Sequence, residues 1–367
     1  MIEKKYWLSI LLIVQIVVLQ IVSLFPDFVE TYYSNGIYPL ISVTLRFTFG
    51  FFPFSVGDIL YGIFLFLMIR MLWKFRKNRK YFVLALFNVI SIFYFFFHFL
   101  WAVNYHRIPL YEKLDIEREY SFEQLEDFAF KLIEKTNSIH RTITGKDSIK
   151  VINPYSEKEI FEKSIESYHN LNKIFPYLNY KTPSIKTSLI STPLSYMGFS
   201  GYLNPFTNEA HVNKHIPKYN FPTTTLHEMT HQLGIASESE ANFIGFLASV
   251  HSSDIYIQYS GYVFALKYCL RNLDLTDEEN QEKFLSAINP GILENIDESR
   301  QFQEKYSTVL EYFFEWFYDY FLKFNQQKDG IKGYNNFIGL MINYYQSSAI
   351  ISTSNNHNFL FIKNHDF

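Results

Sequence analysis

Cysteine is almost missing from this sequence, since Cys269 is the single thiol among 367 residues. One thiol cannot form an internal disulfide bond or a cysteine-rich zinc site, so any metal ion must be held by histidine and carboxylate side chains. Net charge is also low, with a formal value of −3. Because no aromatic-basic recognition motif accompanies this charge, we expect no nucleic acid as a partner.

Apolar and aromatic residues are abundant instead, at 48% and 19% of the chain, with 39 Phe and 28 Tyr. The mean hydropathy is close to zero, so the apolar surplus must be local. It gathers in three stretches, at about 6–25, 56–73 and 81–103. Each has the roughly 20 residues that a helix needs to cross a bilayer. The sequence therefore predicts a membrane anchor over residues 1–103 with three transmembrane helices.

Basic residues predict the orientation of this anchor. Lys4 and Lys5 precede the first stretch, and the short loop 74–80 is rich in Lys and Arg, whereas segment 26–55 carries only Arg46. The positive-inside rule then places the amino terminus and the 74–80 loop in the cytoplasm. We expect a multi-pass protein of the inner (cytoplasmic) membrane, with the lipid bilayer as a partner and residues 104–367 on the extracytoplasmic (periplasmic) side.

Two alternatives affect this topology. The first stretch could be a cleaved secretory signal peptide, because it starts with basic residues. The apolar piece 38–54 is broken by Pro39, Gly50 and Pro53, which is typical of a re-entrant or interfacial segment. If it were instead a fourth span, the downstream orientation would reverse, but Arg46 in its middle makes that costly.

Residues 104–367 have the pattern of a mostly helical domain with a small β element. A helix is predicted at about 122–141, with Ser121 as N-cap and Gln124 in a capping box. Another is predicted from 157 to 174 after Ser156. Short, turn-rich strands are expected at 185–189, 202–204 and 210–212. Further helices are expected at about 223–233, 238–250, 257–272, 276–287, 299–325 and 329–346. The fold class is therefore mainly α.

The stretch His227-Glu228-Met229-Thr230-His231 is the strongest chemical signal. Two histidines four residues apart on a helix project from one face and can bind one ion, for which zinc is the expected cofactor. Glu228 would lie beside the open coordination position, where it can act as general base toward a metal-activated water. Thr223 to Thr225 are expected to cap this helix and Gly234 to end it.

A third metal ligand is required, and the next helix offers two. Ser237 can cap that helix with Glu240 in the capping-box position, which favours Glu238 as the ligand and leaves Glu240 as the alternative. Asn242 follows Glu238 by one turn on the same face. It can hydrogen-bond a ligand histidine and fix the tautomer of its ring.

Other segments could complete such a site. The stretch 198–213 is expected to form a short hairpin whose edge strand pairs with an extended peptide. His211 at its end is predicted to lie on the surface, with a role as an extra ligand as the alternative. The aromatic run 312–324 is predicted to be core or membrane-facing surface. An oxyanion stabiliser should come from the later helices, and the candidates are Tyr262, Tyr318 and Tyr334.

These motifs resemble the gluzincin branch of zinc peptidases, in which a glutamate on a second helix completes the site. Glu238-Ser-Glu-Ala241-Asn242 is similar to the E-x-x-A-D signature of membrane-embedded members, although Asn242 replaces Asp and the two motifs lie closer together here. The chain more closely resembles the DUF3810 family of Bacteroidota membrane proteins, in its amino-terminal spans, segment 101–107, segment 201–207 and the His-Glu-x-x-His block. The resemblance implies a zincin-like fold and brings no established substrate.

Together these features predict a membrane-anchored, zinc-dependent metallopeptidase that hydrolyses a peptide or protein substrate. A metzincin site is excluded because Ser237 stands where a third histidine is needed. A cysteine hydrolase has no support, since Cys269 lies in an apolar helix and is expected to pack. The alternatives are a non-catalytic membrane scaffold or sensor that retains a zincin fold, and a zinc hydrolase acting on another bond.

Overall fold

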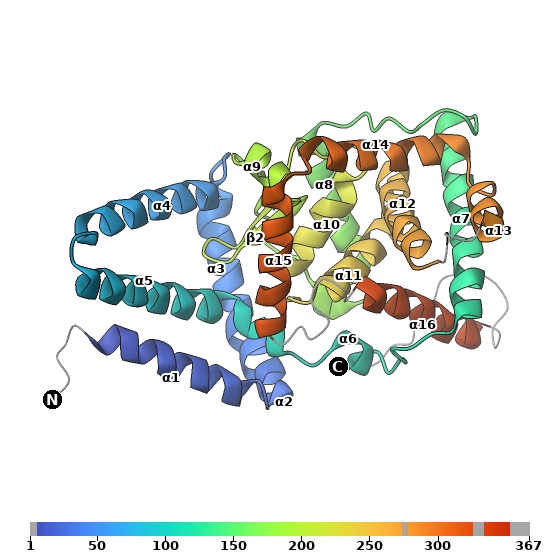
Figure 1. The fold of residues 1–367 in the computed structure, drawn as a ribbon. Helices are drawn as coiled ribbons and strands as arrows, with labels where there is room; N and C mark the ends of the chain where they lie inside the picture. The colour runs from blue at the N-terminus through green and yellow to red at the C-terminus, as the bar shows by residue number, and fades with distance from the viewer. Residues whose placement is uncertain (1–5, 274, 276–277, 326–333, 353–367) are drawn as a thin grey trace.

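The structure, a computed structural model, describes residues 6–273, 275, 278–325 and 334–352. It is mainly helical, and its described part contains a single sheet of three short strands. In Figure 1 a group of apolar helices projects from one side of a larger helical body. The predicted fold class, mainly α with a small β element, is confirmed at this level.

Two helices are long and apolar enough to cross a membrane, α4 (Val56–Phe75) and α5 (Arg79–Leu100). Only 11% of each apolar window is buried inside the protein, so these side chains require an apolar surrounding. The first predicted span is shorter than expected, because α1 ends at Val22. It qualifies only together with residues 26–50, from which it is bent by 100°. The two or three candidate spans are consistent with a membrane protein.

Residues 26–50 form a helix in three sections: α2 (Pro26–Phe28), the π-helical η2 (Val29–Ile37) and α3 (Tyr38–Gly50). The buried side chains of α3 follow the i, i+4 spacing: Tyr38, Ser42 and Arg46. Arg46 lies over the ring of Tyr180, 5.1 Å from its centroid. This segment alone is not among the candidate spans of the described chain, and its central arginine is accommodated by protein rather than lipid.

A connecting segment leads into the larger body through η3 (Ala102–His106), α6 (Leu110–Lys113), α7 (Phe122–Thr144) and α8 (Glu157–Asn172). Both predicted caps are present. Ser121 and Gln124 form a capping box at the start of α7. Ser156 caps α8, where Glu159 completes a second capping box. The sequence therefore specifies these helix starts locally.

The sheet consists of β1 (Ile185–Thr187), β2 (Gly201–Asn204) and β3 (Glu209–Val212) in the order β1-β3-β2. β1 runs parallel to β3, and β2 forms the predicted antiparallel hairpin with β3. β2 is therefore an edge strand, as expected. The 3-10 turn η4 (Pro176–Leu178) precedes the sheet, and α9 (Ser191–Tyr196) connects β1 to β2.

The remaining helices are α10 (Phe221–Gln232), α11 (Glu238–Val250), α12 (Ile255–Asn272), α13 (Glu278–Leu285), α14 (Pro290–Tyr306), α15 (Val309–Phe324) and α16 (Tyr334–Ser352). The prediction of one helix over 299–325 is wrong. Pro290 starts α14 earlier, and Ser307 and Thr308 take extended conformations that separate α14 from α15. The first residues of the predicted 329–346 helix lie outside the described residues.

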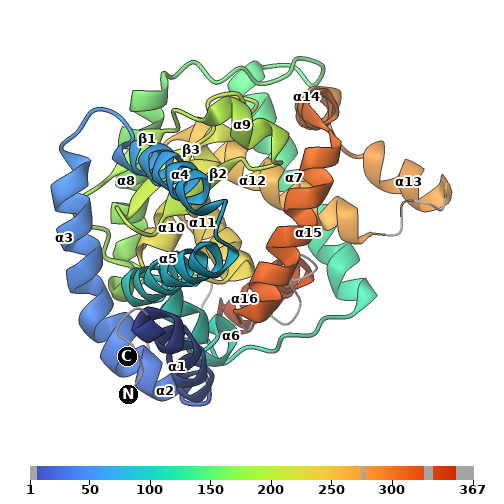
Figure 2. The same ribbon diagram turned by 60° about the vertical axis from the view of Figure 1, so that its left-hand side comes forward.

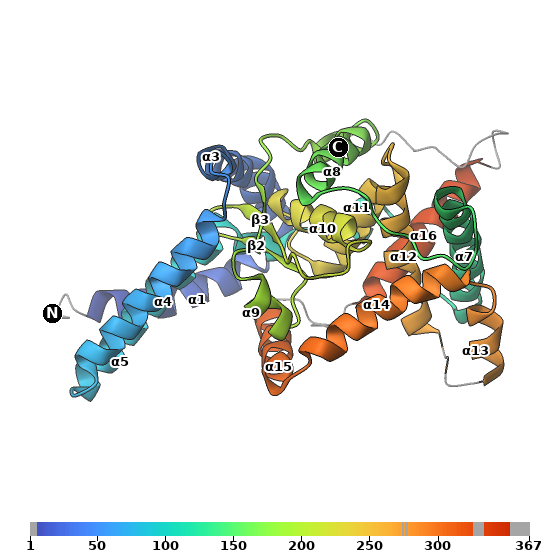
Figure 3. The ribbon, with the colours of Figure 1, turned by 90° about the horizontal axis from the view of Figure 1, so that it is seen from above.

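Two apolar cores hold these elements together. The larger one surrounds α10 and α11, and Cys269 is fully buried in it as a packing residue. Figure 3 shows α10 near the middle of the body, with α7, α12 and α16 to one side. The smaller core joins Tyr38 and Trp101 to Ala236 and Leu322. It therefore ties the amino-terminal helices to the loop between α10 and α11.

Candidate metal centre

The helix that carries the His-Glu-Met-Thr-His stretch begins differently from the prediction. α10 starts at Phe221 after Asn220, which makes no side-chain cap. Thr224 and Thr225 lie inside the helix, where their hydroxyls donate back to backbone carbonyls one turn earlier. The end matches the prediction, because Gly234 has φ +78°. A Cβ at this position would also lie only 2.8 Å from the Tyr38 ring. Both the positive φ and this close contact therefore require glycine.

The two histidines of α10 converge as the four-residue spacing predicts. Their Nε2 atoms lie 3.1 Å apart. The Nδ1 of His231 lies 2.7 Å from the carbonyl oxygen of Ile235. Because a carbonyl only accepts, this Nδ1 carries the proton and Nε2 keeps its lone pair for a cation. The loop after Gly234 thus sets the tautomer of His231.

Glu238 is the carboxylate that reaches both histidines. Its Oε2 lies 3.3 Å from the Nε2 of His227, and its Oε1 lies 3.6 Å from the Nε2 of His231. The hydroxyl of Tyr318 donates to the same Oε1 at 2.6 Å. Glu228 adds a second carboxylate, since ligand atoms of His227, Glu228 and His231 all lie within 4.8 Å of one another. Four candidate residues therefore share one site.

Glu240, the alternative ligand, is occupied elsewhere. Its Oε1 accepts a hydrogen bond from the backbone N–H of Leu110 at 2.7 Å, which ties α11 to the start of α6. The predicted capping box is wrong, because Ser237 makes no side-chain cap and its hydroxyl meets Ser239. Of the two glutamates, the structure brings only Glu238 to the histidines.

Asn242 is buried near His227. Burial lowers the pKa of His227, but Glu238, Glu228 and, to a smaller extent, Asn242 outweigh it, so the pKa is raised. Asn242 therefore lies close enough to interact with the ring, as predicted, but Nδ1 of His227 has no close hydrogen-bond partner among the described residues. The tautomer is instead fixed at His231, by a backbone carbonyl. Sequence spacing identified the face of α11 but could not resolve this detail.

Burial and nearby charges give Glu228, Glu238 and His231 widely different pKa values. Burial, together with Glu238, raises the pKa of Glu228 to about 8. Burial acts the same way on Glu238, but His231, His227 and Tyr318 outweigh it and lower that pKa to about 2. Burial lowers the pKa of His231 to about 4. The site therefore combines a permanent anion with a carboxylate that exchanges protons near neutral pH.

Strand β2 begins directly against Glu228. A Cβ added to Gly201 would lie 2.7 Å from Oε1 of Glu228 and 2.7 Å from the carbonyl oxygen of His211. Because real Cβ contacts do not occur at that distance, glycine is what allows the strand to approach the carboxylate. The edge of the sheet and the site helix are thus in contact, as the sequence suggested.

His211 is not on the surface, and that prediction is wrong. Its side chain is fully buried, stacks on Tyr202 and places Nε2 2.7 Å from the hydroxyl of Ser55, the residue that caps α4. It lies outside the group formed by His227 and its neighbours. Among the oxyanion candidates, Tyr318 contacts the site and Tyr262 packs on Phe246. The side chain of Tyr334 lies outside the described residues.

The end of α10 is braced by residues that sequence reasoning did not single out. The carbonyl oxygen of His231 accepts from the indole N–H of Trp101 at 3.2 Å. That of Gln232 accepts from Tyr38 and Ser42, at 3.1 and 2.9 Å. These oxygens belong to the last turn, where no intrahelical donor is available. Of these residues, Trp101 lies in segment 101–107, which carries a signal in the sequence through the family resemblance.

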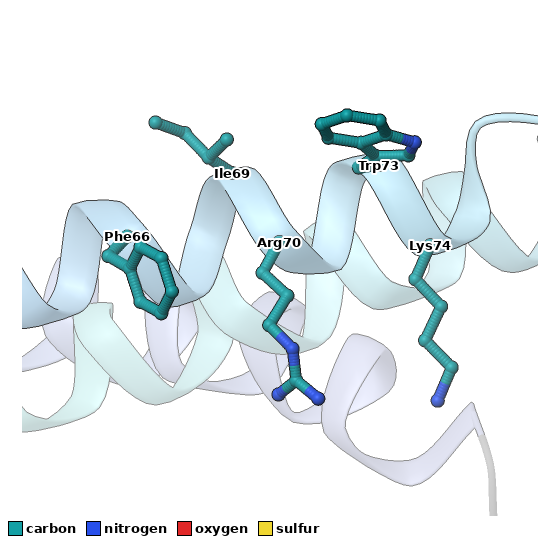
Figure 4. Close-up of a pocket in the computed structure, with 5 residues that line it drawn as sticks. All are labelled: Phe66, Ile69, Arg70, Trp73 and Lys74. Atoms are coloured by element: carbon teal, nitrogen blue, oxygen red, sulfur yellow. The ribbon is translucent and has the colours of Figure 1, made fainter.

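The donor set fits zinc. Two imidazole nitrogens and a carboxylate are ligands that zinc accepts, and no cysteine is needed. Oε2 of Glu228 is buried and has no hydrogen-bond partner among the described residues, so a polar group facing the cluster would satisfy it. A hollow along α4 is unsuited to a metal ion, because the residues that line it include no histidine and no carboxylate: Phe66, Ile69, Arg70, Trp73 and Lys74 (Figure 4).

Comparison with known proteins gives one relationship. Residues 33–342 match the family model described as "Protein of unknown function (DUF3810)". No curated protein and no solved structure matches the chain. The matched region includes α3, both candidate spans, the sheet and both helices of the metal centre. The chain is therefore a member of the DUF3810 family.

Proposed function

We propose that the chain is a membrane-anchored zinc metallopeptidase that acts on a peptide or protein substrate. The observation that carries this proposal is the convergence of His227, His231 and Glu238 on one point with Glu228 beside them. The first three would hold the ion and Glu228 would serve the reaction. A helix supplying two histidines and a second helix supplying a glutamate also support a zincin-like fold.

A bound zinc ion would polarise a peptide carbonyl and lower the pKa of water. Glu228 then takes the proton from the attacking water and delivers it to the leaving nitrogen. Burial raises the pKa of Glu228 to about 8, and a cation beside it would lower that pKa and favour the carboxylate that accepts the proton. Tyr318 holds Glu238 through its hydroxyl, which keeps that carboxylate turned toward the histidines.

The neighbouring sheet edge suggests how a peptide would be held. β2 pairs with β3 on one side and contacts Glu228 at its start. An extended peptide added to the other side of β2 would pass beside the reacting groups. This arrangement favours a peptide over a compact small-molecule substrate.

The basic residues support an inner-membrane location with the site outside the cytoplasm. Figure 4 shows Arg70 and Lys74 projecting from the end of α4 that leads into the basic loop. The positive-inside rule keeps this loop in the cytoplasm. The metal centre lies beyond the opposite ends of α4 and α5, so we place it on the periplasmic side.

Metal analysis and turnover test the proposal together. Purified protein should hold about one zinc ion, and Glu228→Gln should keep the metal but lose cleavage of an internally quenched peptide library. Glu238→Ala should lose the metal, whereas the matched variant Glu240→Ala should retain it. Metal loss in Glu240→Ala alone would reverse the choice of ligand. Metal-free wild type whose stability is indifferent to chelators would favour the non-catalytic scaffold.

A further inference from the structure

Helix α15 carries an apolar face that the protein leaves exposed. At 3.6 residues per turn, its large apolar side chains cover an arc of about 160°. All are between 46% and 85% exposed: Val309, Leu310, Tyr312, Phe313, Trp316, Phe317, Tyr320 and Phe324. A soluble surface rarely concentrates so many large apolar groups on one helix. This outer face of α15 therefore requires a partner.

The opposite face of α15 is already occupied. Leu322 is buried in the smaller core, and Phe321 packs on Phe97 of α5 with ring centroids 5.6 Å apart. His98 of α5 lies 3.3 Å from the side-chain oxygen of Asn325, directly after the helix. These contacts fasten α15 to the last turn of a candidate span, where that span leaves the membrane.

The direction of α15 fits the surface of a bilayer. In Figure 2, α4 and α5 are seen almost end-on, while α15 runs across the view beside them. Its axis therefore lies across the spans rather than along them. Figure 1 shows α15 at the boundary between the projecting helices and the body. An apolar face at this level continues the exposed apolar surface of the spans.

The composition of α15 also fits an interface. Trp and Tyr favour the boundary between headgroups and acyl chains, because their rings are apolar and their polar atoms can reach water. The charged groups follow one another every four residues along one side of α15: Glu311, Glu315, Asp319 and Lys323. Lys323 lies just inside the apolar arc and pairs with Asp319 at 2.6 Å, so its charged end is directed to the polar side. An apolar face beside a row of charged side chains is the pattern of helices that lie in the plane of the membrane.

We propose that the outer face of α15 is embedded in the headgroup and acyl boundary of the bilayer, on the side of the membrane that holds the metal centre. The proposal does not depend on peptidase activity. It has one consequence for the site: the inner face of the same helix presents Tyr318 to Glu238. The metal centre then lies about one helix diameter, roughly 10 Å, from the lipid.

Spin labels on the full chain in nanodiscs of phosphatidylethanolamine and phosphatidylglycerol test this placement. The variants Phe313→Cys and Tyr320→Cys carry one label each, and Cys269 stays in place because it is fully buried. Phe66 on α4, which is 65% exposed, gives the lipid reference. Gln301 on α14 is exposed and gives the aqueous reference.

Accessibility to oxygen, which partitions into lipid, is compared with accessibility to a soluble nickel chelate. We expect the labels at Phe313 and Tyr320 to behave like the one at Phe66, with nickel accessibility at least about fivefold below that at Gln301. Nickel accessibility equal to that of Gln301 would overturn the proposal. Exclusion of both reagents would show a protein cover, and spectral broadening that spin dilution removes would show a second copy; either result also overturns it.

Discussion

Replacing Gly201 by alanine should separate metal binding from catalysis. The new Cβ would lie 2.7 Å from Oε1 and 2.9 Å from Cγ of Glu228. Ordinary van der Waals contact begins at 3.4 Å, so one partner must move by about 0.7 Å. The strand is held by its pairing with Val212, and the carbonyl oxygen of His211 blocks the other side. The contact with the backbone of His211 therefore strains the strand pair, and the flexible Glu228 side chain is the group that moves furthest.

A displacement of this size in a reacting group costs about 100-fold in turnover. Crowding of the strand should also lower the free energy of unfolding by about 1–3 kcal/mol. Zinc should stay bound, because the nearest atoms to the new methyl group belong to Glu228 and His211 rather than to the proposed ligands. The measurements are zinc content, cleavage of an internally quenched peptide library and thermal unfolding.

Gly62→Ala is the matched control. It makes the same change in α4, where an added Cβ meets nothing within 4 Å, so zinc content and cleavage should both stay at wild-type levels. Wild-type cleavage by Gly201→Ala would refute Glu228 as the base. Loss of zinc from the folded Gly201→Ala variant would refute the separation of Glu228 from the metal ligands.

Three further changes test other contacts. Tyr318→Phe removes the hydroxyl that donates to Glu238, so zinc affinity in competition with a chelator should fall about 10- to 100-fold while thermal stability stays nearly constant. Trp101→Phe removes the donor to the carbonyl of His231 and should cost about 1–2 kcal/mol in denaturant unfolding. Burial lowers the pKa of Lys267 to about 8 in the folded state, against 10.5 unfolded. Between pH 8 and 10.5 the unfolded chain holds a proton on Lys267 that the folded protein has lost, so the free energy of unfolding should rise with pH over this range. Lys267→Met should remove this slope and stabilise the protein at pH 7 by up to about 3 kcal/mol.

Local signals in the sequence predicted local structure well. The capping box at the start of α7, the glycine that ends α10 and the hairpin of β2 and β3 are encoded within a few residues, and each appears as expected, whereas the capping box predicted at Ser237 does not form. The two histidines and Glu238 also follow from helical spacing and one short loop. The separation of α14 from α15 was missed, because neither Gly nor Pro marks Ser307 and Thr308.

Contacts between distant segments were not predictable in the same way. His211 looks like a polar residue on a short strand, but its partner Ser55 lies 156 positions away, at the start of a candidate span. Arg46 looks costly in an apolar stretch until α3 packs it against Tyr180. In both cases the burial of the side chain depends on how the amino-terminal helices dock against the rest of the protein. The periodicity of residues within a segment cannot predict such docking.

This docking bears on how the metal centre is built. The last turn of α10 would ordinarily leave its carbonyl oxygens to water. Here Tyr38, Ser42 and Trp101 donate to two of them, and Arg107 donates to Gly234 in the loop that follows. That loop supplies the carbonyl that selects the tautomer of the second histidine. The segments flanking the candidate spans thus help to orient the donor atoms of the candidate metal centre, so we expect any chemistry there to depend on the membrane-proximal part of the chain.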